Sequence, residues 1–253
     1  MFINNFDPVA IQFFSLEIRW YSLAYITGII LGWSLSKKIF ISDPQIKEKF
    51  DDFITYLIIG IIIGGRLGYV FFYNLNYFIL NPLEIFFIWN GGMSFHGGLL
   101  GLIIAAIIFS KKRNFDKLII LDVVACVAPV GIFFGRLANF INGELYGKPT
   151  DIPWAVTFPL VDTRARHPSQ IYEALLEGFL LFLILNYVIR KISYKKGVCS
   201  ALFLVFYSIF RIISELFREP DIQIGYIFNY ISMGSILSFF MLVIGMAMYL
   251  KIK

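Results

Sequence analysis

Seven long apolar stretches, separated by polar connections, organise the chain. They are Tyr21–Ser36, Phe53–Tyr73, Met93–Ser110, Leu118–Ile141, Ile171–Ile189, Val198–Phe217 and Tyr226–Leu250. A helix needs about 20 apolar residues to cross about 30 Å of hydrocarbon, and most of these stretches approach or exceed that length. The pattern therefore predicts an all-α, polytopic membrane helical bundle of seven transmembrane helices.

The positive charges alternate between the connections that join these stretches. Fourteen of the 22 Lys and Arg residues lie in every second connection or at the carboxyl terminus. They are Lys37, Lys38, Lys47, Lys49, Lys111, Lys112, Arg113, Lys117, Arg190, Lys191, Lys195, Lys196, Lys251 and Lys253. By the positive-inside rule these connections face the cytoplasm, which predicts an extracytoplasmic amino terminus and a cytoplasmic carboxyl terminus.

The third stretch is the weakest of the seven, because its uninterrupted apolar part begins only at Leu99. Its length also permits a re-entrant segment. A re-entrant segment would place Lys111 and Lys117 outside and break the alternation of charge. We therefore favour seven full spans in a single integral membrane domain, residues 1–253.

Two of the expected outer connections are long. Residues 74–92 contain no Lys or Arg and include an apolar piece, Leu83 to Trp89, that suits the membrane interface. Residues 142–170 contain four prolines and are expected to form a small extracytoplasmic cap.

The composition narrows the function classes. Of the 253 residues 58% are hydrophobic, and the net charge of +5 is explained by lysine-rich loops that face anionic lipid headgroups, so no nucleic-acid partner is expected. Cys126 and Cys199 lie inside apolar stretches, where a thiol behaves as a small hydrophobe. Two His and two buried Cys do not form a zinc site, and no phosphate-binding Gly-rich loop with Lys-Ser or Lys-Thr is present. No metal or cofactor is expected.

Four ionisable side chains share one depth in the expected membrane. At 1.5 Å of rise per residue, Arg66 and Arg211 lie about 20 Å from the inner ends of their spans, and Arg136 about 27 Å. His96 lies about 21 Å above Ser110. Charged residues within spans are functional-site candidates. Basic groups with few evident acids nearby predict an anionic ligand, and a lipid phosphate suits the bidentate fork of arginine.

Each of these residues also has a structural interpretation. Arg66 follows two glycines and is at least as well explained as support for a helix contact. His96 can bond to a carbonyl at the membrane interface. Tyr207, Arg211 and Glu215 share one helical face, so Arg211 and Glu215 can form an internal ion pair.

Two further polar residues have simple structural interpretations. Asp122 lies four residues into its span, near the cytoplasmic surface, and we expect it to be structural. Ser169, just before the fifth span, is a candidate helix N-cap.

Residues 135–147 read Gly-Arg-Leu-Ala-Asn-Phe-Ile-Asn-Gly-Glu-Leu-Tyr-Gly. This run resembles the full signature of the prolipoprotein diacylglyceryl transferase family, with every specified position filled. The similarity extends over nearly the whole chain. It includes Arg19-Trp20-Tyr21, Gly64-Gly65-Arg66, Gly91 to Gly98, His167 to Glu173, and Tyr207 through Arg211 to Arg218-Glu219-Pro220-Asp221.

The resemblance implies a reaction in the bacterial cytoplasmic (inner) membrane. The diacylglyceryl group of phosphatidylglycerol would be transferred to the thiol of the lipobox cysteine, next to the signal peptide of a prolipoprotein, and glycerol phosphate would be released. His96 would act as the base for the thiol, and Arg136 and Arg211 would hold the phosphate. The expected lipid-binding residues are Arg136, Asn139, Glu144, Tyr21, Gly147, Arg66, Tyr207 and Glu215.

Two alternatives stay open. The same basic residues suit a channel or carrier for an anionic lipid or small anion, although the internal repeats of many carriers are not visible. Phosphoryl transfer between lipid headgroups is a second alternative, but it normally requires acidic metal ligands, and the spans contain no Asp-rich cluster.

Overall fold

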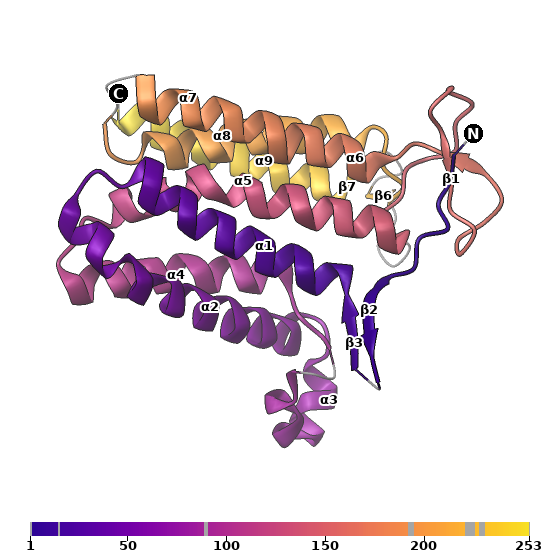
Figure 1. Cartoon of the computed structure of the whole chain (residues 1–253), viewed down its shortest axis with the longest axis horizontal. Helices are drawn as coiled ribbons and strands as arrows, with labels where there is room; N and C mark the ends of the chain where they lie inside the picture. The colour runs from indigo at the N-terminus through magenta and orange to yellow at the C-terminus, as the bar shows by residue number, and fades with distance from the viewer. Residues whose placement is uncertain are drawn as a thin grey trace. The chain divides into compact units, whose positions relative to one another are not determined.

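The computed structural model of the chain describes residues 2–14, 16–88, 91–191, 195–220, 226–227 and 231–252. The chain divides into two compact units, one made of Met1–Phe40 with Asp122–Lys253 and the other of Ile41–Leu121. Long helices dominate both units (Figure 1). The predicted class of helical membrane protein is therefore confirmed.

Five helices of the described residues are long and apolar enough to cross a membrane. They are Pro44–Phe72, Lys117–Asn142, Ser169–Arg190, Val198–Glu215 and Met233–Ile252. Each overlaps one of the predicted spans. Two further helices, Trp20–Leu35 and Phe95–Arg113, occupy the other two predicted stretches. The count of seven spans and the orientation of the termini stay predictions.

The unit Ile41–Leu121 is an antiparallel pair of long helices joined by a partly helical loop. Its elements are α2 (Pro44–Phe72), α3 (Leu75–Leu80), a 3-10 helix (Pro82–Phe86) and α4 (Phe95–Arg113). Asp43 caps α2 by accepting a hydrogen bond from the Gln45 backbone N–H at 2.8 Å. Ser94 caps α4 in the same way, through the Gly97 N–H at 3.2 Å.

Glycines bring the backbones of α2 and α4 into contact. Gly60, Gly64 and Gly68 of α2 face Gly97 and Gly101 of α4. A Cβ added to Gly68 would lie 2.7 Å from the Gly97 Cα, and one added to Gly101 would lie 2.8 Å from the Gly60 carbonyl carbon. Helices in lipid associate through such close packing of small residues, because apolar surroundings supply no hydrophobic driving force.

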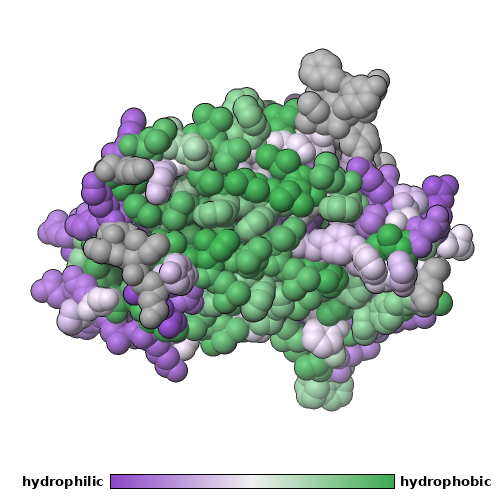
Figure 2. Space-filling view, turned by 90° about the horizontal axis from the view of Figure 1, so that it is seen from above, coloured by the Kyte–Doolittle hydropathy of each residue, from purple (hydrophilic) through white to green (hydrophobic). Residues whose placement is uncertain are grey.

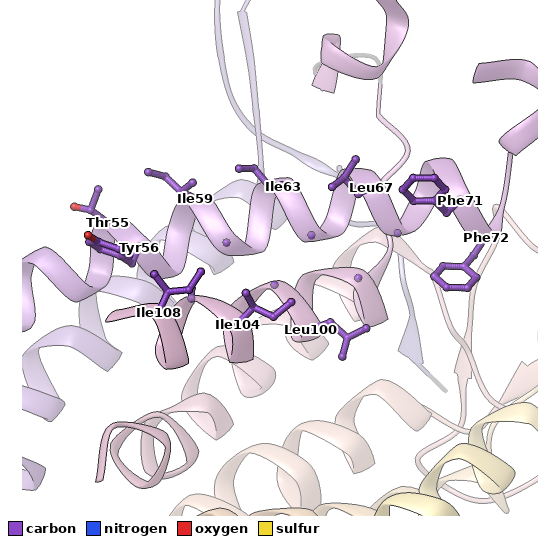
Figure 3. A pocket seen from close by; sticks show the side chains of 16 residues that line it. Thr55, Tyr56, Ile59, Ile63, Leu67, Phe71, Phe72, Leu100, Ile104 and Ile108 are labelled. Atoms are coloured by element: carbon purple, nitrogen blue, oxygen red, sulfur yellow. The ribbon is translucent and has the colours of Figure 1, made fainter. Parts of the chain in front are cut away.

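An apolar groove of about 750 Å³ runs along one side of this helix pair (Figure 3). Its walls are exposed aliphatic side chains spaced four residues apart on each helix: Ile59, Ile63 and Leu67 on α2, and Leu100, Ile104 and Ile108 on α4. The glycines of the helix contact form its floor. Exposed aliphatic walls of this kind suit a surface that faces lipid.

The other unit contains the remaining long helices. They are α1 (Trp20–Leu35), α5 (Lys117–Asn142, of which the part from Asp122 onward belongs here), α8 (Val198–Glu215) and α9 (Met233–Ile252). One more helix is composite, because α6 (Ser169–Glu173) continues through a π-helical segment (Ala174–Leu180) into α7 (Leu181–Lys191). A π-helical turn, Ser36–Phe40, also follows α1.

Glycines set close helix contacts in this unit too. A Cβ added to Gly28 of α1 would lie 2.9 Å from the Gly131 Cα of α5. One added to Gly178, in the π-helical segment, would lie 2.7 Å from the Phe133 Cβ of α5. The composite helix therefore approaches α5 closely within one turn of Arg136.

The outer surface of α7 and α9 is apolar. Leu183, Tyr187, Phe240 and Ile244 are all exposed there. Figure 2 shows hydrophobic residues over the middle of this face and hydrophilic residues toward its two ends. This distribution is that of helices whose central turns lie in hydrocarbon.

Short strands occur near the amino terminus and between the long helices. They are β1 (Phe2–Ile3), β2 (Val9–Phe13), β3 (Leu16–Arg19), β4 (Val156–Thr157), β5 (Ala165–Arg166), β6 (Tyr226–Ile227) and β7 (Ile231–Ser232). One sheet has the order β1-β4-β5, with β1 parallel to β4, and the other strands form two hairpins. No strand was predicted, because segments of two to five residues are too short for a clear alternation of polar and apolar positions.

Arg166 organises the segment expected to form the cap. Its guanidinium donates hydrogen bonds to the Asp162 carboxylate at 2.6 and 3.2 Å, to the Gly147 carbonyl at 3.0 Å and to the Glu219 carboxylate at 3.2 Å. The hydrogen bond from Arg166 lowers the pKa of Asp162. These contacts tie the segment between α5 and α6 to the residues that follow α8.

Asp122 and Ser169 both make hydrogen bonds at the ends of helices. Asp122 accepts hydrogen bonds from the backbone N–H groups of Gly197 and Ser200, both at 2.7 Å, so it caps α8 as a structural residue. Ser169 is not an N-cap. It is the first residue of α6, and its hydroxyl donates to the Leu145 carbonyl at 2.9 Å. The N-cap position of α6 is occupied by the preceding residue, Pro168, which has no backbone N–H.

Gly64 offers a test of the α2/α4 contact. In Gly64→Ala the new Cβ would press against the Gly97 carbonyl oxygen, whereas in Gly98→Ala the nearest atoms are 3.7 Å away. We expect Gly64→Ala to lower stability by about 1 to 3 kcal/mol, the usual range for overpacking. Thermal unfolding in detergent measures the difference. Equal midpoints for the two variants would contradict close packing at Gly64.

Candidate functional site

Two arginines and two glutamates from three helices form a closed ring of ion pairs. Arg136 of α5 contacts Glu173 at 2.9 Å and Glu177 at 3.2 Å. Arg211 of α8 contacts the same two carboxylates at 3.1 and 3.6 Å. We call Arg136, Glu173, Glu177 and Arg211 the arginine–glutamate ring. The two glutamate side chains are fully buried, and the arginine side chains are 16% and 12% exposed.

The composite helix aims both glutamates at the arginines. Glu173 ends α6, and Glu177 lies four residues later in the π-helical segment. Residues four apart share a helix face, and π-helical turns inside α-helices occur frequently at functional sites. The two carboxylates are therefore presented on one face of the composite helix, the second of them from its π-helical segment.

Further polar residues extend the ring along α8. Arg211 Nη2 lies 2.5 Å from Glu215 Oε1, and Arg218 Nη1 lies 3.3 Å from Glu173 Oε1. The proposed ion pair of Arg211 with Glu215 is confirmed. Tyr207 precedes Arg211 by one turn and lies within electrostatic range of the ring.

Gly234 of α9 covers the pair of Arg211 and Glu215. A Cβ there would press against Glu215 Oε1 and lie 3.4 Å from Arg211 Nη2. Sequence reasoning did not single out this glycine. Its only sequence signal is a small residue at the start of an apolar stretch, which is too common to mark a site.

The expectation that few acids lie beside the buried arginines is wrong. Glu173 and Glu177 supply them, together with Glu215. Glu177 was not singled out from the sequence. The available signal was its spacing, because Glu173 and Glu177 lie four residues apart in or beside an apolar stretch and so present two acids on one face.

A hydrogen-bonded chain of polar side chains follows the ring along α5. Asn139, three residues after Arg136, donates to the Tyr21 hydroxyl at 3.4 Å and to the Glu144 carboxylate at 3.3 Å. Asn142 donates to the other Glu144 oxygen at 3.3 Å. Tyr21, Arg136, Asn139 and Glu144, predicted as site residues, therefore lie together.

Glycines shape the turn that leaves α5. Gly143 adopts a φ of +67°, which favours glycine. Gly147, one of the expected lipid-binding residues, lies at a close backbone contact. Its N–H donates to the His167 carbonyl at 3.0 Å, and an added Cβ would press against that oxygen and lie 2.7 Å from the Phe217 carbonyl oxygen. Close backbone approach on two sides requires glycine there.

Arg66, in the other unit, is enclosed by backbone carbonyls. Its Nε, Nη1 and Nη2 donate five hydrogen bonds, at 2.5 to 3.3 Å, to the carbonyl oxygens of Glu84, Ile85, Phe87, Gly91 and Gly92. A guanidinium carries five N–H groups, so all of them are used. This geometry favours the supporting interpretation of Arg66 over direct contact with lipid.

His96 lies in the first turn of α4. Its side chain is outside the described part of the structure, as is Asp221 of the carboxyl-terminal motif. Its expected role as a base, and its expected approach to Arg136 and Arg211, stay predictions. Among the described residues no group of three or more His, Cys, Asp or Glu side chains suits a metal ion.

Comparison with known proteins identifies the family. Residues 8–251 match the sequence model of prolipoprotein diacylglyceryl transferase. The chain belongs to this family. A phosphatidylglycerol--prolipoprotein diacylglyceryl transferase of Rickettsia bellii is 50% identical over 99% of this chain and 97% of its own length. Proteins of the same name from Rhodopseudomonas palustris and Ehrlichia canis are 48% and 50% identical over 95% and 94% of this chain, and 87% and 93% of their own lengths.

Within this member of the prolipoprotein diacylglyceryl transferase family, the signature run and the ring form one continuous polar site. Arg136 belongs to both, and Asn139 and Glu144 continue from it. The N–H groups of Arg136 and Arg211 outnumber their contacts with the glutamates, because each guanidinium carries five. Both arginines can therefore bind a second anion without leaving their carboxylates.

The enclosure of Arg66 predicts a structural role that a substitution can test. In Arg66→Lys, three ammonium N–H groups would face five carbonyls, and each unsatisfied buried carbonyl costs about 1 to 3 kcal/mol. We expect a lower unfolding midpoint and faster proteolysis within residues 81–88. The control is Arg113→Lys, which alters an exposed arginine paired with Asp52. Unchanged protease resistance in Arg66→Lys would contradict the role.

Proposed function

We propose that this chain transfers the diacylglyceryl group of phosphatidylglycerol to the thiol of the lipobox cysteine of prolipoproteins. The reaction forms a thioether and releases glycerol phosphate. The buried ring, in a chain that matches the transferase family over nearly its whole length, is the observation that carries the proposal. The enzyme acts in the bacterial cytoplasmic (inner) membrane, with seven spans and an extracytoplasmic amino terminus.

Arg136 and Arg211 bind the phosphate of the lipid. Their guanidinium groups, which come from α5 and α8, are held by Glu173 and Glu177 of the composite helix, so they are oriented before the lipid arrives. Preoriented donors in a buried site stabilise charge more effectively than donors that must reorganise. The same N–H groups stabilise the charge that grows on the phosphate as the ester bond breaks.

The nucleophile belongs to the prolipoprotein. Cys126 and Cys199 of this chain are buried, which suits a structural rather than a nucleophilic role. A free thiol has a pKa near 8.5, so a base is needed to form the thiolate. His96 is the proposed base.

The chemical step breaks a carbon–oxygen bond. The thiol proton passes to His96, and the thiolate sulfur attacks the glycerol carbon that carries the phosphate ester. The sulfur–carbon bond forms as the carbon–oxygen bond breaks, and the oxygen leaves with its electron pair as part of glycerol phosphate. Arg136 and Arg211 stabilise this leaving group.

The remaining site residues orient the lipid headgroup or the arginines. Tyr21, Asn139 and Glu144 form the hydrogen-bonded chain beside Arg136 and offer hydroxyl, amide and carboxylate groups to the glycerol head. Tyr207 and Glu215 position Arg211.

Gly147 and Arg66 act through the backbone around them. Gly147 keeps the turn after α5 close to the His167 carbonyl, and Arg66 supports the loop between α2 and α4. Both contribute to lipid binding indirectly.

Turnover of a lipobox peptide tests the proposed function. Purified protein with phosphatidylglycerol should add the mass of a diacylglyceryl group to the peptide cysteine, in the presence of chelator. With heavy oxygen at the bridge between diacylglycerol and phosphorus, the label should appear in glycerol phosphate. Label in free diacylglycerol, or activity that depends on magnesium, would instead indicate phosphoryl transfer. An unchanged peptide would contradict the transferase function and favour a carrier for an anionic lipid.

Substitution of the ring arginines tests their proposed role. Arg136→Gln or Arg211→Gln should reduce turnover by about a hundredfold or more, the usual effect of removing one charge-stabilising donor. Arg→Lys should restore little, because an ammonium lacks the bidentate fork. Circular dichroism in detergent checks that the variants fold. Near-normal turnover in both Lys variants would show that these positions need only a positive charge, which would contradict bidentate binding of the phosphate.

A further inference from the structure

The arginine–glutamate ring is electrically balanced when its carboxyl groups are ionised. Two arginines face two glutamates, and every ring side chain is at most 16% exposed. The flanking contacts with Glu215 and Arg218 add one charge of each sign. A phosphodiester that binds to the ring brings one more negative charge into this buried site.

An extra negative charge in a buried site is strongly unfavourable unless it is compensated. Arginine cannot adjust, because its guanidinium keeps its proton under all physiological conditions. A carboxylate can adjust by taking up a proton, which removes one negative charge and converts an acceptor into a donor. Binding of the lipid is therefore best compensated by protonation of a ring glutamate.

Glu177 is the glutamate whose ionised form is held least firmly. Glu173 contacts three arginines, Arg136, Arg211 and Arg218, at 2.9 to 3.3 Å. Glu177 receives one hydrogen bond, from Arg136 at 3.2 Å, while its Oε1 lies 3.6 Å from Arg211. This Oε1 is buried and, like Glu173 Oε2, has no hydrogen-bond partner among the described residues, but Glu173 accepts two hydrogen bonds through its other oxygen and Glu177 only one.

The charged and titratable groups that act on Glu177 lie on its own composite helix, on α5 and on α8. Glu173 faces it from its own composite helix, Arg136 from α5, and Arg211 and Tyr207 from α8. The negative charge of Glu173 favours a proton on Glu177, and the arginines oppose it. A phosphate bound to these arginines would offset their positive charge and so favour a proton on Glu177.

We propose that Glu177 takes up one proton from water when the phosphate of phosphatidylglycerol binds to Arg136 and Arg211. The ring then stays neutral. Loss of the carboxylate charge also frees Arg136 Nη2 from its ion pair, which adds a donor to the N–H groups that Arg136 has left over for the phosphate. This inference rests on the proposed function, because it takes the ligand to be that lipid.

Isothermal titration calorimetry without prolipoprotein tests the proposal. No turnover occurs without the thiol substrate, so the measured heat reports lipid binding and proton uptake alone. A short-chain phosphatidylglycerol is titrated into the detergent-solubilised full chain, in buffers of different ionisation enthalpy and over a series of pH values. The buffer dependence of the observed enthalpy counts the protons taken up. Phosphatidylcholine of the same chain length supplies a headgroup without net charge.

We expect wild-type protein to take up close to one proton per lipid in part of the pH series. There the affinity should fall with rising pH by up to about tenfold per pH unit, as linkage requires. In Glu177→Gln the lipid should bind with no proton uptake and little pH dependence. The matched control is Glu219→Gln, another glutamate paired with an arginine but outside the ring, which should behave as wild type.

Two results would overturn the proposal. One is lipid binding by wild-type protein without proton uptake at any pH, which needs no variant to be folded. The other is proton uptake by Glu177→Gln equal to that of wild type. A wild-type protein that fails to bind phosphatidylglycerol would instead overturn the proposed function, so the two failures are distinct.

Discussion

The structure depends on the compensation of charge inside an apolar helix bundle. Arg136 and Arg211 lie at the depth of apolar helix turns, where an unpaired charge costs at least about 2.5 to 3.5 kcal/mol. Glu173 and Glu177 remove that penalty and at the same time fix the guanidinium groups in place. Because the four charges cancel, the ring is stable without ligand. An anion that binds to it adds a negative charge that the ring must compensate.

Close helix packing makes this compensation possible. Gly178 lets the composite helix approach α5 at Phe133, and Gly234 lets α9 cover the pair of Arg211 and Glu215. A larger residue at either position would push apart the helices that carry the ring. The glycine contacts and the ion pairs therefore support each other, since the side chains reach across only because the backbones lie close together.

Much of the fold and part of the site could be predicted from the sequence. Apolar stretches locate the long helices, because hydrocarbon leaves an α-helix as the main way to satisfy the backbone. The depth argument correctly brought Arg136 and Arg211 together, and the signature run correctly joined Asn139 and Glu144 to them. The depth of the arginines follows from the rise of a helix per residue, and the grouping of Asn139 and Glu144 follows from the resemblance to the family signature.

Other features depend on contacts that one sequence does not reveal. Glu177 was missed because the spacing of Glu173 and Glu177 puts two acids on one helix face but does not show which basic residues of α5 and α8 they contact. The short strands were missed because they hold too few residues for a clear alternation, and the pairing of β1 with β4 also joins residues far apart in the chain. Arg66 resembled Arg136 in sequence, yet its donors point into a loop of carbonyls.

The central claim is that Arg136 and Arg211 bind the lipid phosphate directly. Solid-state NMR can measure the dipolar coupling between lipid phosphorus and arginine guanidinium nitrogens labelled with nitrogen-15, in bilayers that contain phosphatidylglycerol. We expect a short-range coupling in wild-type protein that disappears when both arginines are replaced by glutamine. No coupling in wild type, or an unchanged coupling in the double variant, would contradict the account.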